Sequence, residues 1–341
     1  MIEALTGDCR DILKTMPDQS INCCVTSPPY WGLRDYGVNG QIGLEQTPDE
    51  YVAEMVAVFR EVRRVLRDDG TLWLNLGDSY AQAGGSGPQG SSQCERPSSV
   101  KHDRARRRQM GCNLKPKDLV GIPWRVAFAL QANGWYLRQD IIWHKPNPMP
   151  ESVTDRCTKA HEYIFLLSKS AQYYYDQEAI AEPAEASTIE RLAQQEGSDR
   201  VPGKTNGKMK AVGRGGVNAF RGQGHFNHPA NRDGRDMKDV GTGLTRNKRS
   251  VWTVTTKPFK GAHFATFPPD LIRPCILAGC PMGGTVLDCF GGAGTTALVA
   301  EEEGRNSTLI EMNGEYADMA RDRTGQLGLF CEPNKPLAPA E

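Results

Sequence analysis

The chain has 341 residues, of which 38% are hydrophobic and 24% charged, as in a globular protein with one large domain or a domain with an insertion. No apolar run reaches the roughly 18 residues of a membrane helix, and the N-terminus lacks the basic and apolar regions of a secretory signal, so we expect a cytoplasmic protein. The ten cysteines form no C-x-x-C pair, which argues against a zinc ribbon or a disulfide framework. His225 and His228 have no third ligand nearby, so we expect no metal.

The net charge is zero, but the charges are unevenly distributed. Residues 101–117 hold seven Lys/Arg and one Asp (+6), and residues 200–260 hold fourteen Lys/Arg and three Asp (+11), so the remainder carries −17. Two basic segments on an otherwise acidic chain indicate a polyanionic partner that is bound at particular places. The alternative is a pair of solvated loops.

The first ordered stretch, residues 1–80, begins with a short apolar segment that ends at Gly7-Asp8, and a strand is predicted over 21–26. Thr47, Pro48 and Glu50 have the spacing of a capping box with proline at the first helical position. Apolar residues then recur at helical intervals until Asp69-Gly70, where the helix is expected to end; they are Val52, Met55, Val56, Phe59, Val62 and Leu66. The next strand is predicted over 71–76.

Two further stretches continue the alternation of strands and helices. Residues 117–180 predict a helix over 123–133 and strands near 136–143 and 162–167, and residues 251–325 predict strand, glycine-rich turn, helix, strand and helix. This order implies a mainly parallel sheet covered on both faces. Residues 81–116 and 182–250 interrupt it with polar, Gly- and Arg-rich sequence that has no periodicity. Loops of that length are usually functional or disordered.

A glycine-rich turn at 288–294, which we call the glycine loop, joins a predicted strand to a helix. Such a turn lets a ligand approach bare backbone at a helix N-terminus. Glu311, 23 residues after Asp288, ends the next strand, about where nucleotide-binding units place the carboxylate that holds ribose hydroxyls. Asp288 would repel a pyrophosphate but accept a hydrogen bond from an ammonium group, which favours S-adenosyl-L-methionine. The alternative is a tight turn without a ligand.

A tetrapeptide, Ser27-Pro28-Pro29-Tyr30, ends the buried strand at 21–26, and Trp31 follows it. If it lies at the carboxyl end of the strand, the Ser27 hydroxyl and the carbonyls near the prolines face a pocket. Two acceptors that hold the N–H groups of an exocyclic base amine would direct its lone pair at a methyl donor. Tyr30, with help from Trp31, would stack on a base that has left the duplex. The alternative is a structural Pro-Pro turn.

Together these motifs resemble the amino-group DNA methyltransferases of the permuted class, in which the catalytic tetrapeptide precedes the cofactor loop. The resemblance covers about 225 residues in three blocks. It implies a Rossmann-like α/β fold with a mainly parallel seven-stranded sheet, S-adenosyl-L-methionine as cofactor, and double-stranded DNA as partner. The implied cofactor residues are Asp8, His263, Thr266, Asp288, Phe290, Gly291, Gly292, Gly294, Thr295, Thr296, Glu311 and Met312. The implied catalytic residues are Ser27, Pro28, Pro29, Tyr30 and Trp31.

The same resemblance divides the chain. Residues 1–80, 117–181 and 251–330 are expected to form the catalytic domain, 81–116 a flexible basic loop, 182–250 a target-recognition insertion, and 331–341 a tail. The basic side chains expected to contact DNA are Arg104, Arg106, Arg107, Arg108, Arg214, Arg221, Arg246, Lys248 and Arg249. A bacterial or phage enzyme, with or without a cognate restriction endonuclease and as a monomer or homodimer, fits these features.

The target amine has two candidates, because cytosine N4 beside N3 and adenine N6 beside N1 present nearly the same edge. In the family, serine at the first tetrapeptide position is associated mostly with cytosine, so Ser27 favours N4-cytosine over N6-adenine. Methylation of RNA or of a glutamine side chain is a rival within the same chemistry. A non-catalytic DNA-binding protein is a rival from another class, although it would be expected to lose the tetrapeptide or the glycine loop.

Overall fold

The structure is a computed structural model that describes residues 2–33, 35–81, 114–185, 245–256 and 267–328. The chain forms two compact units, one from Met1–Ile180 with Arg249–Glu341 and the other from Ala181–Lys248. The residues proposed at 104, 106, 107, 108, 214 and 221, the histidines at 225 and 228, and the cofactor residues proposed at 263 and 266 lie outside the described residues.

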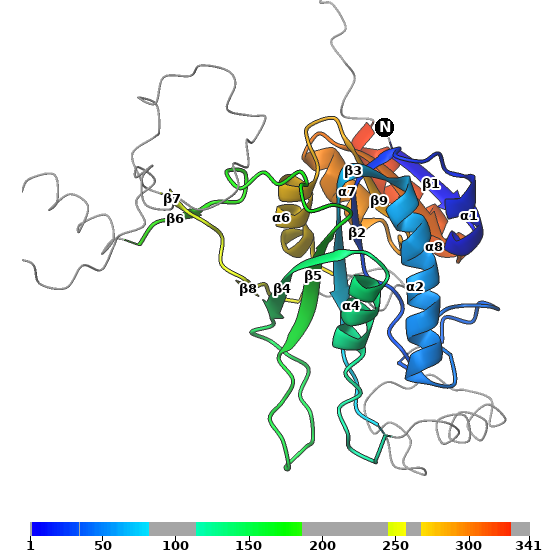
Figure 1. The fold of residues 1–341 in the computed structure, drawn as a ribbon, viewed down its shortest axis with the longest axis vertical. Helices are drawn as coiled ribbons and strands as arrows, with labels where there is room; N and C mark the ends of the chain where they lie inside the picture. The colour runs from blue at the N-terminus through cyan, green and yellow to red at the C-terminus, as the bar shows by residue number, and fades with distance from the viewer. Residues whose placement is uncertain (1, 34, 82–113, 186–244, 257–266, 329–341) are drawn as a thin grey trace, which may run out of the picture. The chain divides into compact units, whose positions relative to one another are not determined.

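An eight-stranded sheet forms the centre of the larger unit (Figure 1). Only β5 is antiparallel to its neighbours, so the expectation of a mainly parallel sheet is confirmed, with eight described strands in place of seven. The additional strand is β8, a three-residue edge strand paired with β4. Across the sheet the order is β1 (Ile2–Thr6), β10 (Asn306–Glu311), β9 (Thr285–Asp288), β2 (Ile21–Thr26), β3 (Leu66–Leu76), β5 (His161–Ser168), β4 (Tyr136–His144) and β8 (Val251–Thr253).

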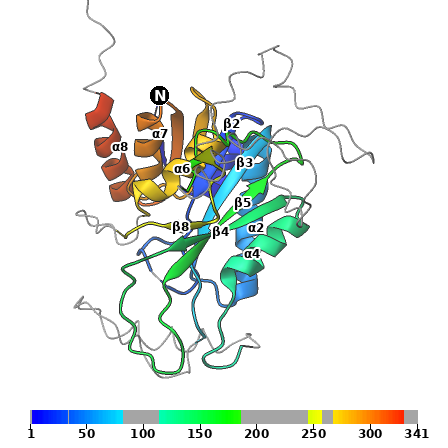
Figure 2. The ribbon, with the colours of Figure 1, turned by 90° about the vertical axis from the view of Figure 1, so that its left-hand side faces the viewer.

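Helices cover both faces of the sheet (Figure 2). One face carries α1 (Cys9–Thr15), α2 (Pro48–Val65) and α4 (Ile122–Ala132), whose buried apolar residues join one core cluster with β2 and β3. The other carries α6 (Pro269–Gly279), α7 (Thr295–Glu302) and α8 (Gly314–Gly328), with α6 and part of α7 in a second cluster. None of the described helices is long and apolar enough to cross a membrane.

Helix α2 begins as the sequence predicts and ends earlier. Thr47 and Glu50 exchange side-chain and backbone hydrogen bonds in a capping box, with Pro48 in the first turn. The helix was expected to continue to Asp69-Gly70, which is wrong. Leu66 already has extended backbone and pairs with Ile21, so β3 starts there. Pairing with β2 therefore overrides the helical spacing of Leu66.

The order of the strands in the sheet reverses between the parallel strands β9 and β2, and this fixes the location of the site. From β9 the chain passes through α7 to β10 on one side, and from β2 it passes through α2 to β3 on the other. Adjacent parallel strands whose connections diverge leave a crevice at their carboxyl ends, where open α/β sheets bind ligands. The carboxyl end of β9 opens into the glycine loop, and that of β2 into the tetrapeptide.

In the smaller unit, β6 (Glu182–Pro183) pairs antiparallel with β7 (Thr245–Arg246). Arg246 lies 2.7 Å from Glu185, and Lys248 lies 3.3 Å from Glu182. Both side chains proposed to contact DNA thus have acidic neighbours in this structure. Arg249 is described in the larger unit, where its carbonyl accepts a hydrogen bond from the Trp252 indole.

Candidate active site

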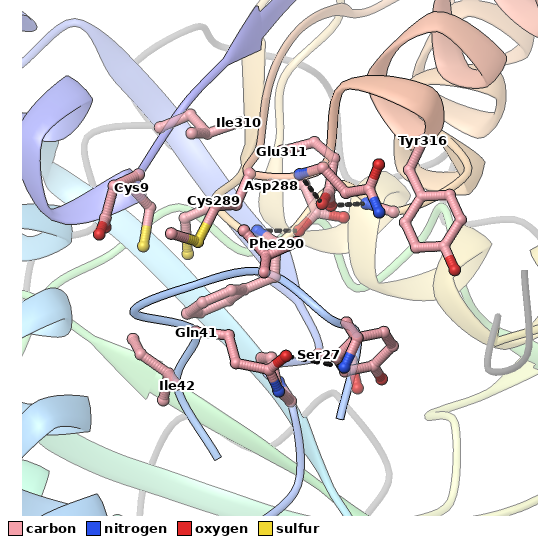
Figure 3. Close-up of a pocket in the computed structure, with 18 of the residues that line it drawn as sticks. Cys9, Ser27, Gln41, Ile42, Asp288, Cys289, Phe290, Ile310, Glu311 and Tyr316 are labelled. Atoms are coloured by element: carbon pink, nitrogen blue, oxygen red, sulfur yellow. Dashed lines mark hydrogen bonds between the residues drawn. The ribbon is translucent and has the colours of Figure 1, made fainter. Parts of the chain in front are cut away.

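A pocket lies at the carboxyl ends of β1, β2, β9 and β10 (Figure 3). It brings together Asp8, Ser27, Pro29 and the glycine loop, although Asp8 and Asp288 are 280 positions apart in the sequence. The remaining proposed cofactor residues at its wall are Thr295, Glu311 and Met312. Figure 3 shows Asp288, Phe290 and Glu311 on one side of it and Ser27, Gln41 and Ile42 on the other. Within the described residues, no group of three or more His, Cys, Asp or Glu could hold a metal ion.

Asp288 organises the start of the glycine loop. Its Oδ1 accepts hydrogen bonds from the Thr26 hydroxyl at 2.6 Å and the Phe290 amide at 3.1 Å, and its Oδ2 accepts from the Thr296 hydroxyl at 2.6 Å. Burial raises the pKa of this carboxyl to about 6, against the opposing effect of the three donors. The bonds hold the carboxyl at the pocket wall and join the loop to β2.

The glycines of the loop are required by close approaches and by backbone conformation. Gly292 has φ 51° and Gly294 has φ 75°, and a Cβ on Gly294 would lie 2.8 Å from the Cβ of Ala320 in α8. A Cβ on Gly291 would lie 3.1 Å from that of Leu309. The loop therefore lies tightly between β10 and α8, with its backbone facing the pocket.

Glu311, at the end of β10, accepts two backbone hydrogen bonds, from Gly292 at 2.8 Å and from Asn313 at 2.8 Å. Burial raises the pKa of its carboxyl above the ordinary range, although these donors oppose the shift. One carboxylate thus fixes the glycine loop and the turn into α8. Its remaining acceptor capacity is available to ligand hydroxyls, because a carboxylate has about four acceptor sites.

Asp8 caps α1 and pairs with Arg10. Its carboxylate accepts from the Arg10 amide at 2.8 Å and lies 2.6 Å from the guanidinium. Burial would raise the pKa of Asp8, but the bonds and charge of Arg10 outweigh it and lower that pKa. Arg10 also donates to the Gly40 carbonyl at 2.7 Å. It thereby ties Asp8 to the segment 36–42, which forms part of the pocket wall and which the sequence reasoning missed. The closely spaced glycines Gly37, Gly40 and Gly43 were the sequence signal for this loop, and all three have positive φ in the structure.

The tetrapeptide leaves β2 beside the glycine loop. Ser27 and Pro29 line the pocket, whereas Pro28 is buried. The Pro29 carbonyl, expected to face the pocket, accepts a hydrogen bond from the buried Tyr51 hydroxyl at 3.0 Å. One of the two acceptor sites of that carbonyl is therefore used within the protein.

The two aromatic residues of this segment have different surroundings. Trp31 is only 8% exposed, packs in the core and donates its indole N–H to the Glu45 carbonyl at 3.1 Å, so its placement does not fit the stacking role expected for it. The Tyr30 ring lies against Gly77, where an added Cβ would be 2.5 Å from the ring. Its hydroxyl donates to Glu162 at 2.8 Å.

A mainly parallel, doubly covered sheet with a glycine loop and a carboxylate-lined pocket at its switch point defines the class of S-adenosyl-L-methionine-dependent methyltransferases. Comparisons with solved structures agree with this fold. The cytosine-N4-specific PvuII DNA methyltransferase matches with a TM-score of 0.57 and 18% identity over 98% of this chain and 90% of that one. A putative DNA modification methylase of Thermus thermophilus, complexed with S-adenosyl-L-methionine, matches with a TM-score of 0.55 and 20% identity over 96% of this chain and 94% of that one.

Sequence comparisons show the family. The DNA methylase family N6_N4_Mtase matches residues 21–322. The type II methyltransferase M.XycI of Xanthomonas campestris pv. cyanopsidis is 45% identical over 93% of this chain and 85% of its own length. The type II methyltransferase M.SmaI of Serratia marcescens is 42% identical over 94% of this chain and 89% of its own length. The chain belongs to the N6/N4 DNA methylase family and is a site-specific, S-adenosyl-L-methionine-dependent DNA methyltransferase.

Proposed function

We propose that the protein transfers a methyl group from S-adenosyl-L-methionine to the exocyclic N4 amine of cytosine in duplex DNA. The observation that carries this proposal is the position of Ser27, which shares one pocket with Asp288 and Glu311. A base amine held at Ser27 and a methyl donor held by the glycine loop would meet across the boundary between β2 and β9.

The pocket suits a cofactor with an amino-acid end and a ribose. Asp8, Asp288 and Glu311 make its polar lining acidic, with Arg10 as the basic group among the lining residues. Such a lining disfavours phosphates and favours an ammonium group. In this proposal Asp288 faces the methionine part, Glu311 the ribose hydroxyls, and the backbone of Gly291 and Gly292 lies against the cofactor. The bound cofactor supplies an electrophilic methyl group.

The chain's own residues prepare the amine. Ser27 and the Pro28 carbonyl accept hydrogen bonds from its two N–H groups, which turns the nitrogen lone pair out of the base plane. The cofactor would supply the methyl group by direct in-line displacement and leave as the neutral thioether, and the proton that the amine loses would pass to solvent. The base has to leave the duplex to reach Ser27 in the pocket.

Serine at position 27 favours cytosine, and N6 of adenine is the alternative target for the same pocket. The type II names of the relatives support a bacterial, cytoplasmic enzyme that protects DNA from a cognate endonuclease. Residues 182–250, with their excess of Lys and Arg, are proposed to recognise the target sequence, and 81–116 to add a basic loop. This assigns sequence recognition to the insertion and chemistry to the larger unit.

Nucleoside mass spectrometry tests the proposal. The purified protein is incubated with unmethylated mixed-sequence duplex DNA and methyl-labelled cofactor, and the digested DNA is analysed. We expect labelled N4-methylcytosine. Labelled N6-methyladenine would keep the mechanism and overturn the assignment of the base. Label in RNA or protein substrates, with none in DNA, would overturn the choice of substrate.

A further inference from the structure

Behind the tetrapeptide lies a polar cluster of Asn75, Lys145 and Glu162, none of which lines the cofactor pocket. They meet the hydroxyls of Tyr30 and of the pocket residue Ser27. Asn75 is in β3, Glu162 in β5 and Lys145 directly after β4. Asn75 is 5% exposed, and the side chains of Lys145 and Glu162 are 18% and 16% exposed. Charged groups this far from solvent require defined partners.

Glu162 is the acceptor at the centre of the cluster. Its Oε2 accepts from the Tyr30 hydroxyl at 2.8 Å and from Asn75 Nδ2 at 3.3 Å, while its Oε1 pairs with Lys145. Because the Tyr30 proton is committed to Glu162, the hydroxyl oxygen of Tyr30 acts as an acceptor, and it receives Asn75 Nδ2 at 2.9 Å. The hydroxyl of Tyr30 is therefore used within the protein, and its ring remains for the base.

Asn75 extends the cluster to Ser27. Its Nδ2 lies 3.3 Å from Ser27 Oγ, and its two protons are shared among Ser27, Tyr30 and Glu162. Ser27 Oγ then keeps one lone pair, which matches the amine donor of a base edge. Asn75 Oδ1 is buried and has no hydrogen-bond partner among the described residues, whereas its Nδ2 has three acceptors within 3.3 Å.

We propose that Glu162, acting through Tyr30 and Asn75, is a positioning residue for methyl transfer, which rests on the proposed function of the tetrapeptide. It fixes the direction of both hydroxyls, and Lys145 holds its carboxylate in place. The carboxylate itself touches neither the methyl donor nor the amine. Glu162 affects methyl transfer by fixing the positions of the Ser27 and Tyr30 hydroxyls.

The Glu162→Gln variant tests this with little change in shape. An amide has one donor side, so its nitrogen faces either the Lys145 ammonium or the donors Tyr30 and Asn75, and one set loses its acceptor. We expect kcat to fall about 10- to 100-fold, as for a misplaced reactive group, while the Kd for S-adenosyl-L-methionine stays within about twofold. Glu303→Gln is the matched control, because Glu303 is 22% exposed and pairs with Arg273 in another part of the larger unit.

A double-mutant cycle with Tyr30→Phe separates positioning from a general loss of structure. If Glu162 acts through the Tyr30 hydroxyl, the double variant is about as slow as the slower single variant. Additive losses in kcat, or an unchanged kcat in Glu162→Gln, would overturn the proposal. The same cycle on the free energy of unfolding needs no substrate, and absence of coupling there would also overturn it.

The two proposals fail differently. Methyl transfer is scored as total label in DNA, so label on adenine would reject the base assignment without affecting the comparison of variants. An unaltered kcat in Glu162→Gln would reject the positioning role while N4-methylcytosine is still formed.

Discussion

The Thr26 hydroxyl lies 2.6 Å from Oδ1 of Asp288, and this hydrogen bond joins the last residue of β2 to the last residue of β9. The two residues are 262 positions apart in sequence, and both are buried. One bond thus links the strand that carries the tetrapeptide to the strand that carries the glycine loop. The placement of the tetrapeptide relative to the glycine loop depends on contacts between these two strands.

Replacing Thr26 with valine should therefore weaken both folding and cofactor binding. The methyl group fills the space of the hydroxyl but leaves the Asp288 carboxylate one donor short, at a cost of about 1–3 kcal/mol in the free energy of unfolding. Chemical denaturation and calorimetric titration with S-adenosyl-L-methionine measure the two effects. Thr15→Val, at the exposed end of α1, is the control. Equal stability of the two variants would show that the bond to Asp288 is dispensable.

The pH dependence of cofactor binding follows from the raised pKa of Asp288, about 6. Because the folded-state pKa lies above the ordinary 3.8, the folded protein holds this proton more tightly than the unfolded chain. The resulting stabilisation is present below about pH 4 and is lost as the pH rises through 6, by roughly 3 kcal/mol. A cofactor ammonium requires the ionised carboxylate, so affinity should rise about tenfold from pH 5 to pH 7.

Calorimetric titration at several pH values checks this. The Asp288→Asn variant should bind the cofactor more weakly and with a smaller dependence on pH. The remaining dependence reflects Glu311, because burial also raises the pKa of that carboxyl. A wild-type affinity that is constant from pH 5 to pH 8 would argue against contact between Asp288 and a cationic group.

The sequence was most informative where local chemistry decides the structure. The capping box at Thr47 and the turn after Asp288 depend on neighbouring residues, and both lie where the pattern predicted them. The end of α2 was missed because pairing between Leu66 and Ile21 is not visible in helical periodicity. Likewise, nothing local to Glu162 reveals that β5 places it beside Tyr30, 132 positions earlier. Contacts between distant strands required the structure.

Gly292→Val should abolish measurable cofactor binding. Gly292 has φ 51°, a region that a β-branched residue rarely adopts, and its amide donates to Glu311. The substitution strains the loop. It also places a side chain where the loop backbone is proposed to contact the cofactor. Gly283→Val is the matched control, since Gly283 has φ 72° with open space around it in the turn before β9. We expect comparable loss of stability in both variants and unchanged cofactor affinity in the control alone.

Ser27→Ala should reduce turnover much more than cofactor affinity. Loss of one hydrogen-bond partner of the reacting amine is expected to lower kcat by about 100-fold, the order seen when a preorganised polar group is removed from an active site. The Kd for S-adenosyl-L-methionine should change little, because the glycine loop is untouched. Ser20→Ala, before β2 and exposed, serves as control. Normal turnover by Ser27→Ala would remove this hydroxyl from the mechanism.

Gly77→Ala tests the position of the Tyr30 ring without altering that residue. An added Cβ would lie 2.5 Å from the Tyr30 ring, so the ring or strand β3 has to shift. We expect kcat to fall by at least about tenfold, since the ring is proposed to stack on the flipped base and base–aromatic stacking contributes about 1–3 kcal/mol. Cofactor affinity should be retained, because Gly77 does not line the cofactor pocket. Fluorescence of 2-aminopurine at the target position measures base flipping directly. A variant with wild-type fluorescence and wild-type kcat would show that the Tyr30 ring does not need its present position.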